Sequence, residues 1–128
     1  MRIFVTGGFG FIGSNFILKF INYNNINILN YDKLTYAGNL DNLESIDNRD
    51  NYQYVIGDIC DKNMLSESIM KFKPDVVVHF AAESHVDRSI DSPDSFIQTN
   101  INGTFQILSS SYNYYSKLNN TNKFRFLH

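Results

Sequence analysis

The stretch that most constrains the fold of this chain is Thr6-Gly7-Gly8-Phe9-Gly10-Phe11-Ile12-Gly13. It follows residues 2–5, whose apolar character predicts a short buried strand. It opens a helical pattern whose apolar residues fall on one face, namely Ile12, Phe16, Ile17, Phe20 and Ile21. Glycines therefore stand where a strand turns sharply into a helix. Such a junction lets backbone amides approach a phosphate, and the helix dipole favours the anion.

The glycine spacing is Gly7-x-x-Gly10-x-x-Gly13, which differs from the dinucleotide fingerprint G-x-G-x-x-G. The mechanical roles still apply. Gly7 permits the turn, Gly10 permits close approach of a diphosphate, and Gly13 lets the helix pack closely on the strand. The alternative is an ordinary glycine-rich loop, which the strand before it and the helix after it disfavour.

Strand and helix patterns alternate along the rest of the chain, which predicts an α/β fold with a doubly wound parallel sheet. Further strands are expected at residues 27–31, 52–56, 76–80 and 123–127, and a short helix near 40–45. Ligands of such sheets bind beyond the carboxyl ends of the strands. The sequence ends at His128, directly after the fifth expected strand, so we expect residues 1–128 to form one incomplete domain, truncated after that strand.

Two helices have recognisable boundaries. Asp61 is a predicted N-cap for a helix with Leu65, Ile69 and Phe72 on one face, which Pro74 ends. Ser92 and Pro93 read as the N-cap and first residue of a long helix. That helix is expected to run towards Tyr115 through the apolar residues Phe96, Ile97, Ile101, Phe105 and Leu108.

Composition excludes several classes of protein. With 128 residues and 43% apolar residues, the chain can form a globular core, and its net charge of −2 without a basic run argues against nucleic acid as a partner. Met1 leads directly into a strand and no apolar run reaches about 20 residues, so we expect no signal peptide and no membrane span. The single Cys60 excludes an internal disulfide and suits the cytoplasm. No ligand-like spacing of Cys or His indicates a metal.

Acidic residues follow two of the expected strands. Asp32 lies 19 residues after Gly13, where a carboxylate can accept hydrogen bonds from ribose hydroxyls and repel a 2′-phosphate, which favours NAD over NADP. Lys33 weakens that preference slightly. Asp58 follows the third strand, where it could accept from an adenine amino group while Ile59 covers the ring. Alternatively, both acids merely begin loops.

The loop after the fourth strand holds small and polar residues. Ala81 and Ala82 would let a flat cofactor pass close to the backbone, and Ser84 can donate a hydrogen bond to a ligand oxygen. Glu83 is equally well explained as half of a structural ion pair with Arg88. His85 is interpreted as a loop histidine rather than an acid or base, and His79, inside an apolar strand, as a core residue. We expect no catalytic residue within this chain.

The motifs together resemble one enzyme family. The glycine turn is similar to the opening of extended short-chain dehydrogenases/reductases. Two more specific stretches resemble the dTDP-glucose 4,6-dehydratase family, and the resemblance covers essentially the whole chain. They are Asp32-Lys33-Leu34-Thr35-Tyr36-Ala37-Gly38-Asn39 and His79-Phe80-Ala81-Ala82-Glu83-Ser84-His85-Val86-Asp87-Arg88-Ser89. Residues 99–104 also fit the family pattern.

The resemblance implies a Rossmann-type NAD-binding domain and a role for individual residues. Phe11 and Ile12 would lie at the diphosphate, and Asp32, Lys33, Leu34 and Thr35 along the adenosine. Asp58 and Ile59 would flank the adenine. Phe80, Ala81, Ala82, Glu83 and Ser84 would line the nicotinamide half, with Ser84 also touching the substrate, and Thr99 would contact the cofactor.

The family reaction implied by this resemblance dehydrates dTDP-glucose to dTDP-4-keto-6-deoxyglucose through oxidation at C4, loss of water across C5–C6 and return of hydride to C6. The family's Thr-Asp-Glu and Tyr-x-x-x-Lys segments and its substrate domain would follow His128, so we expect this chain alone to be inactive. A nucleotide-sugar epimerase fragment and a non-catalytic NAD-binding module are the alternatives. Family members are typically homodimers paired through long helices such as residues 92–117.

Overall fold

A five-stranded parallel sheet forms the centre of the computed structural model, which describes residues 1–85, 93–119 and 124–128. Its order is β3-β2-β1-β4-β5. The strands are β1 (Arg2–Thr6), β2 (Asn27–Asp32), β3 (Tyr52–Ile56), β4 (Val76–His79) and β5 (Arg125–Leu127). Every neighbouring pair is parallel, as predicted from the alternation of strand and helix patterns.

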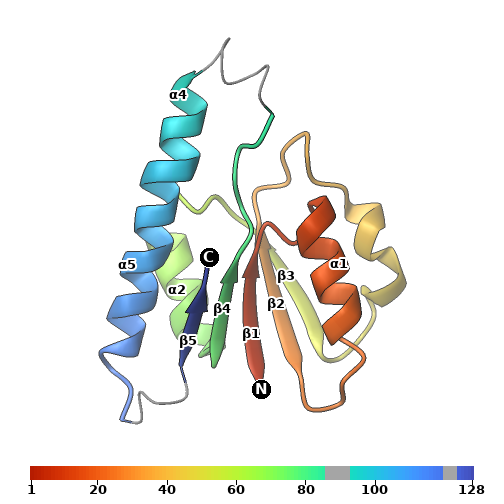
Figure 1. Cartoon of the computed structure of the whole chain (residues 1–128). Helices are drawn as coiled ribbons and strands as arrows, with labels where there is room; N and C mark the ends of the chain where they lie inside the picture. The colour runs from red at the N-terminus through yellow and green to blue at the C-terminus, as the bar shows by residue number, and fades with distance from the viewer. Residues whose placement is uncertain (86–92, 120–123) are drawn as a thin grey trace.

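Helices cover both faces of this sheet (Figure 1). On one side lie α1 (Phe11–Phe20) and the 3₁₀-helix η1 (Leu40–Ile46), and on the other lie α2 (Lys62–Phe72) and α5 (Thr104–Tyr115). The short α4 (Pro93–Phe96) and the π-helical η2 (Ile97–Gly103) lead into α5, so that one long helix has a π-helical middle.

Side chains that alternate between the two faces of the sheet form two apolar cores, one on each face. Ile3 and Val5 of β1 point towards α1, whereas Phe4 points to the opposite face and packs with residues of α2 and α5. Because successive side chains of a strand face opposite ways, a continuous apolar run is what a sheet covered on both sides requires. The expectation of a strand buried on both faces at residues 76–80 is thus confirmed for Val77 and Val78, which lie in different cores.

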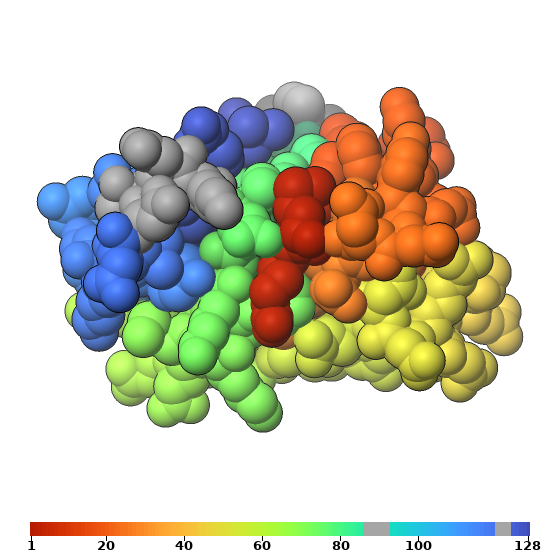
Figure 2. Space-filling view, turned by 90° about the horizontal axis from the view of Figure 1, so that it is seen from below, coloured from red at the N-terminus to blue at the C-terminus, as the bar shows by residue number. Residues whose placement is uncertain are grey.

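The strand order reverses between β1 and β4. The chain passes outward from β1 to β2 and β3, then crosses back to place β4 against β1. A crevice opens at such a point beyond the carboxyl ends of the strands. The amino ends lie at the opposite side of the molecule, where the red start of the chain is seen between green and orange residues in Figure 2.

Most predicted boundaries hold to within one or two residues. Asp61 caps α2 as expected, since its side chain accepts from the amides of Asn63 and Met64, and the helix ends before Pro74 with Lys73 in the left-handed conformation. The expected cap Ser92 and the start of the fifth strand at Lys123 lie outside the described residues.

Three expectations need correction. Ile12, expected on the buried face of α1, is 66% exposed because the first turn projects beyond the sheet. Strand β4 ends at His79, so Phe80 already belongs to the following loop. The long helix is not regular, because residues Ile97–Gly103 are π-helical. No helix among the described residues is long and apolar enough to cross a membrane.

Candidate functional site: a cleft at the reversal of strand order

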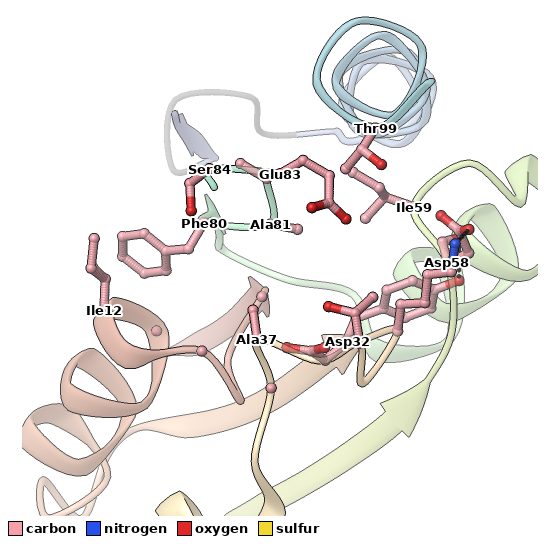
Figure 3. A pocket seen from close by; sticks show the side chains of 18 of the residues that line it. Ile12, Asp32, Ala37, Asp58, Ile59, Phe80, Ala81, Glu83, Ser84 and Thr99 are labelled. Carbon is pink, nitrogen blue, oxygen red and sulfur yellow. Dashed lines mark hydrogen bonds and ion pairs between the residues drawn. The ribbon is translucent and has the colours of Figure 1, made fainter. Parts of the chain in front are cut away.

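A cleft of about 330 Å³ lies beyond the carboxyl ends of the strands. Ile12 and Phe80 lie at one end and Asp58 and Ile59 at the other, while Glu83 and Thr99 lie across from Asp32 (Figure 3). All the residues expected to bind a cofactor line this cleft except Leu34. Those that line it are Gly7, Gly10, Phe11, Ile12, Gly13, Asp32, Lys33, Thr35, Asp58, Ile59, Phe80, Ala81, Ala82, Glu83, Ser84 and Thr99.

The glycine turn has the geometry that its spacing predicts. Gly7 has φ +73°, and a Cβ there would lie 2.5 Å from the backbone nitrogen of Ala81. A Cβ at Gly13 would overlap the carbonyl oxygen of Gly7, so this glycine allows α1 to pack on the turn. At Gly10, by contrast, a Cβ would have its nearest described neighbour, the Gly7 oxygen, at 3.4 Å. Gly10 therefore leaves room on the cleft side.

The first turn of α1 lies at the cleft. Gly10 is the N-cap and makes no side-chain cap hydrogen bond, and the residues of the turn, Phe11, Ile12 and Gly13, line the cleft. The first amides of a helix have no intrahelical acceptor, and the dipole adds positive potential there. This end of the cleft suits a phosphate or diphosphate.

Asp32, at the end of β2, is held in place by backbone amides. Its Oδ2 accepts from the Phe9 amide at 2.9 Å and its Oδ1 accepts from the Leu34 amide at 2.7 Å. Asp32 is 9% exposed and lines the cleft. A carboxylate oxygen that accepts one hydrogen bond can accept a second, so Asp32 can also accept from a ligand hydroxyl. Leu34 itself has φ +54° and packs against the core rather than lining the cleft.

An ion pair joins two loops at one end of the cleft. The Lys33 ammonium lies 2.7 Å from Asp58 Oδ2, and Asp58 Oδ1 accepts from the Cys60 amide at 2.9 Å. Partial burial acts to raise the pKa of the Asp58 carboxyl, but the bonds from Lys33 and Cys60 outweigh it and the pKa lies below its usual value. The same bond raises the pKa of Lys33. Beside them Ile59 is buried beneath Gly103 of the long helix.

Asn100 is a residue that sequence reasoning missed. From η2, its side chain pairs with both backbone groups of Glu83: the Glu83 amide donates to Asn100 Oδ1, and Asn100 Nδ2 donates to the Glu83 oxygen, each at 2.8 Å. This fixes the middle of the loop that lines the cleft between Ala81 and Ser84. π-Helical turns frequently occur at functional sites. Asn100 lies in residues 99–104, which fit the family pattern, but that fit did not indicate this role.

Tyr36 was also missed as a contact. Its hydroxyl donates to Glu83 Oε2 at 2.9 Å, and its ring centroid lies 5.8 Å from that of His85, which is on the exposed part of the loop. The other partner considered for Glu83, Arg88, lies outside the described residues. Further cleft residues that the sequence did not single out are Tyr31, Ala37, Gly38 and Gly57.

His79 is the core residue it was predicted to be. It is 5% exposed, with Nδ1 at 2.6 Å from Thr6 Oγ1 and Nε2 at 3.2 Å from Thr104 Oγ1. Burial, together with the nearby His128, lowers the pKa of His79 to about 4, so the ring is neutral at pH 7. His79 therefore ties the end of β1 to the long helix directly behind the cleft.

These features define the class of the protein. The sheet order, the reversal between β1 and β4, the uncapped helix over the glycine turn and the carboxylate ending β2 make this a Rossmann-type dinucleotide-binding fold. The residues present fit a dinucleotide: open backbone for the diphosphate, an acid for a ribose, and an apolar side chain at the far end for a base. No cluster of side chains within residues 1–85, 93–119 and 124–128 could hold a metal ion.

Comparison with known proteins gives the family. The family model described as GDP-mannose 4,6 dehydratase matches residues 4–128. A probable dTDP-glucose 4,6-dehydratase of Sinorhizobium fredii is 49% identical over 130 residues, covering 100% of this chain and 37% of the relative. The dTDP-glucose 4,6-dehydratase DesIV of Streptomyces venezuelae, solved with NAD bound, superposes with a TM-score of 0.83 at 40% identity, covering 89% of this chain and 36% of that one.

The chain belongs to the dTDP-glucose 4,6-dehydratase family of extended short-chain dehydrogenases/reductases. A UDP-glucose 4-epimerase of Thermotoga maritima is also similar, with a TM-score of 0.79 at 33% identity over 89% of this chain and 35% of that one. The chain thus spans little more than a third of the length of the proteins it matches.

Proposed function

We propose that this chain binds NAD and forms the cofactor-binding part of an NAD-dependent dTDP-glucose 4,6-dehydratase. The observation that carries the proposal is the single cleft that gathers nearly every residue expected at the cofactor. The names of the similar proteins support dTDP-glucose as the substrate. The chain is 40–49% identical to the dehydratases and 33% identical to the epimerase.

The chain's residues would divide the cofactor between them. The amides of Phe11, Ile12 and Gly13 hold the diphosphate, Asp32 accepts from a ribose hydroxyl, and Asp58 and Ile59 meet the adenine. When bound, NAD supplies the acceptor and donor of hydride for the sugar.

The loop after β4 would hold the other half of the cofactor. Ala81 and Ala82 leave space beside the backbone for the nicotinamide ring, and Thr99 faces the cleft from the long helix. Ser84 lies where it can donate to substrate as well. The protein's contribution to catalysis in this part is orientation.

Binding of NAD is tested by calorimetric titration of the purified chain with NAD and with NADP. We expect saturable binding of NAD and weaker binding of NADP, because the Asp32 carboxylate repels a 2′-phosphate. Equal affinity for the two, or no binding of either by a folded chain, contradicts the proposal.

The reaction is tested with a fusion protein in which this chain replaces the matching part of the Sinorhizobium relative. We expect it to convert dTDP-glucose to a 4-keto-6-deoxy product, seen by NMR as a new C6 methyl group. A folded fusion protein that forms no such product would contradict the proposal that this chain can serve as the cofactor-binding part of a dehydratase. We propose that the chain alone is inactive, so keto-sugar formed by residues 1–128 would refute that part.

The long helix supports a second proposal, a homodimer. Its exposed apolar side chains recur at helical spacing and form a stripe of Ile97, Ile101, Phe105, Leu108 and Tyr112, each at least 50% exposed. Contiguous apolar surface on a soluble chain marks an interface. A second copy of this helix would bury the stripe against an identical one.

A further inference from the structure

We propose that the hydrogen bond between Tyr36 and Glu83 is a strap across the cofactor cleft, which must open before a dinucleotide can enter or leave. This inference rests on the proposed binding of NAD. It concerns the rate of exchange rather than affinity.

The bond joins opposite walls of the cleft. Tyr36 lies in the loop after β2, whose neighbouring residues Thr35 and Ala37 line the cleft, and Glu83 lies in the loop after β4. The 2.9 Å bond between the Tyr36 hydroxyl and Glu83 Oε2 therefore spans the space between the two loops. Tyr36 does not line the cleft and is 48% exposed, so the bond crosses on the solvent side.

One end of the strap is firmly anchored. Asn100 pairs with both backbone groups of Glu83, which fixes the loop to the long helix. Movement of the Glu83 backbone would break these two bonds as well, so the strap opens through rotation of the Tyr36 or the Glu83 side chain. At the other end, Tyr36 is 48% exposed, its hydroxyl makes the bond to Glu83, and its ring contacts His85.

The Tyr36→Phe variant isolates the hydroxyl, because phenylalanine keeps the ring and its contact with His85. If the strap closes over both the empty and the filled cleft, its removal speeds entry and exit by the same factor. An exposed hydrogen bond of this kind shifts an equilibrium about two- to tenfold. We therefore expect both rate constants to rise about two- to tenfold while the dissociation constant stays unchanged.

The rates are measured by stopped-flow with NADH. The fluorescence of NADH itself is the probe, since the chain has no Trp whose emission could be followed. Tyr23→Phe is the matched control: Tyr23 is 55% exposed and lies in the turn between α1 and β2, at the amino ends of the strands. This control should leave both rate constants unchanged. In a Glu83→Ala background, Tyr36→Phe should have a smaller effect, since the bond between these two side chains is already absent.

Unchanged rates in Tyr36→Phe would overturn the strap, and so would a raised dissociation constant with an unchanged association rate, which would make the hydroxyl a binding group. A Tyr36→Phe effect of undiminished size in the Glu83→Ala background would overturn it too. These outcomes leave the proposed function intact provided that the unaltered chain binds NADH. If the unaltered, folded chain fails to bind NADH, the proposed function and the strap fall together.

Discussion

At the scale of single residues, Gly10 at the N-cap of α1 and Gly13 in its first turn have different roles, although both are glycines of the same motif. A methyl group at Gly13 would overlap the Gly7 carbonyl oxygen, whereas one at Gly10 would lie in space open to the cleft. We therefore expect Gly13→Ala to lower the free energy of unfolding by about 1–3 kcal/mol, partly offset by the better helix propensity of alanine.

Gly10→Ala should act on binding instead. The N-cap has φ −74°, which alanine adopts without strain, so the free energy of unfolding should change by less than about 1 kcal/mol. The affinity for NAD should fall at least about tenfold, because the added methyl occupies the approach of the diphosphate. Urea unfolding and calorimetry on both variants separate the two effects. Equal losses of affinity without any loss of stability in Gly13→Ala would contradict this assignment.

Asp32 combines a structural and a selective role. In Asp32→Asn one side-chain oxygen replaces two, so one of the amides of Phe9 and Leu34 loses its acceptor, at a cost of about 1–3 kcal/mol of stability. The loss of negative charge should also reduce the preference for NAD over NADP by about tenfold. Calorimetric dissociation constants for the two cofactors give the ratio. Asp41→Asn, an exposed acid on η1, should leave the ratio unchanged.

At the scale of elements, β4 contains a buried titratable group. The pKa of His79 lies near 4 in the folded chain and about 6.5 in an unfolded one, so between these values the unfolded state binds more protons. The contribution of His79 to the free energy of unfolding is therefore fully present above pH 6.5. It falls by roughly 2–3 kcal/mol as the pH is lowered towards 4.

The measurement is chemical denaturation between pH 4 and pH 7. His79→Gln, which keeps a hydrogen-bonding side chain but does not titrate in this range, should flatten the profile. His85→Gln, on the exposed loop, should leave the slope as it is. A slope in His79→Gln as steep as that of the unaltered chain would show that other groups cause it.

The strands and the glycine turn could be predicted because their signals are local. Apolar runs such as residues 76–78 and the strand-to-helix glycines define their structures by themselves, and Asp61 fits the rules of helix capping. The cofactor contact of Leu34 is expected from the family resemblance and stays a prediction, whereas the packing of its side chain against the core and its φ of +54° were not predicted.

The π-helical segment η2 could not be predicted, because its apolar pattern is compatible with an ordinary α-helix. Its consequence, the pairing of Asn100 with Glu83, joins residues 17 positions apart that no pattern connects. The bond from Tyr36 to Glu83 spans 47 positions and depends on the packing of two loops. The sequence thus reveals the ends of strands where ligands bind, and the structure adds the contacts that hold those loops together.

At the scale of the whole molecule, the stripe on the long helix should decide association. Ile101 and Phe105 are 62% and 63% exposed, so replacing both by lysine should leave the fold intact, with stability changed by less than about 1 kcal/mol. We expect the unaltered chain to sediment as a dimer and the double variant as a monomer. Met70→Lys, on the exposed side of α2, is the matched control and should remain dimeric. A monomeric unaltered chain would refute the dimer.

The long helix contributes both to the cofactor cleft and to the exposed apolar stripe. Thr99 and Asn100 form and support a wall of the cleft, and their neighbours Ile97 and Ile101 begin the exposed apolar stripe. If a second copy bound to the stripe makes this helix more rigid, it also changes the free energy of cofactor binding in the cleft. The two equilibria then form one thermodynamic cycle, in which cofactor must strengthen pairing of the chains by the same factor by which pairing strengthens cofactor.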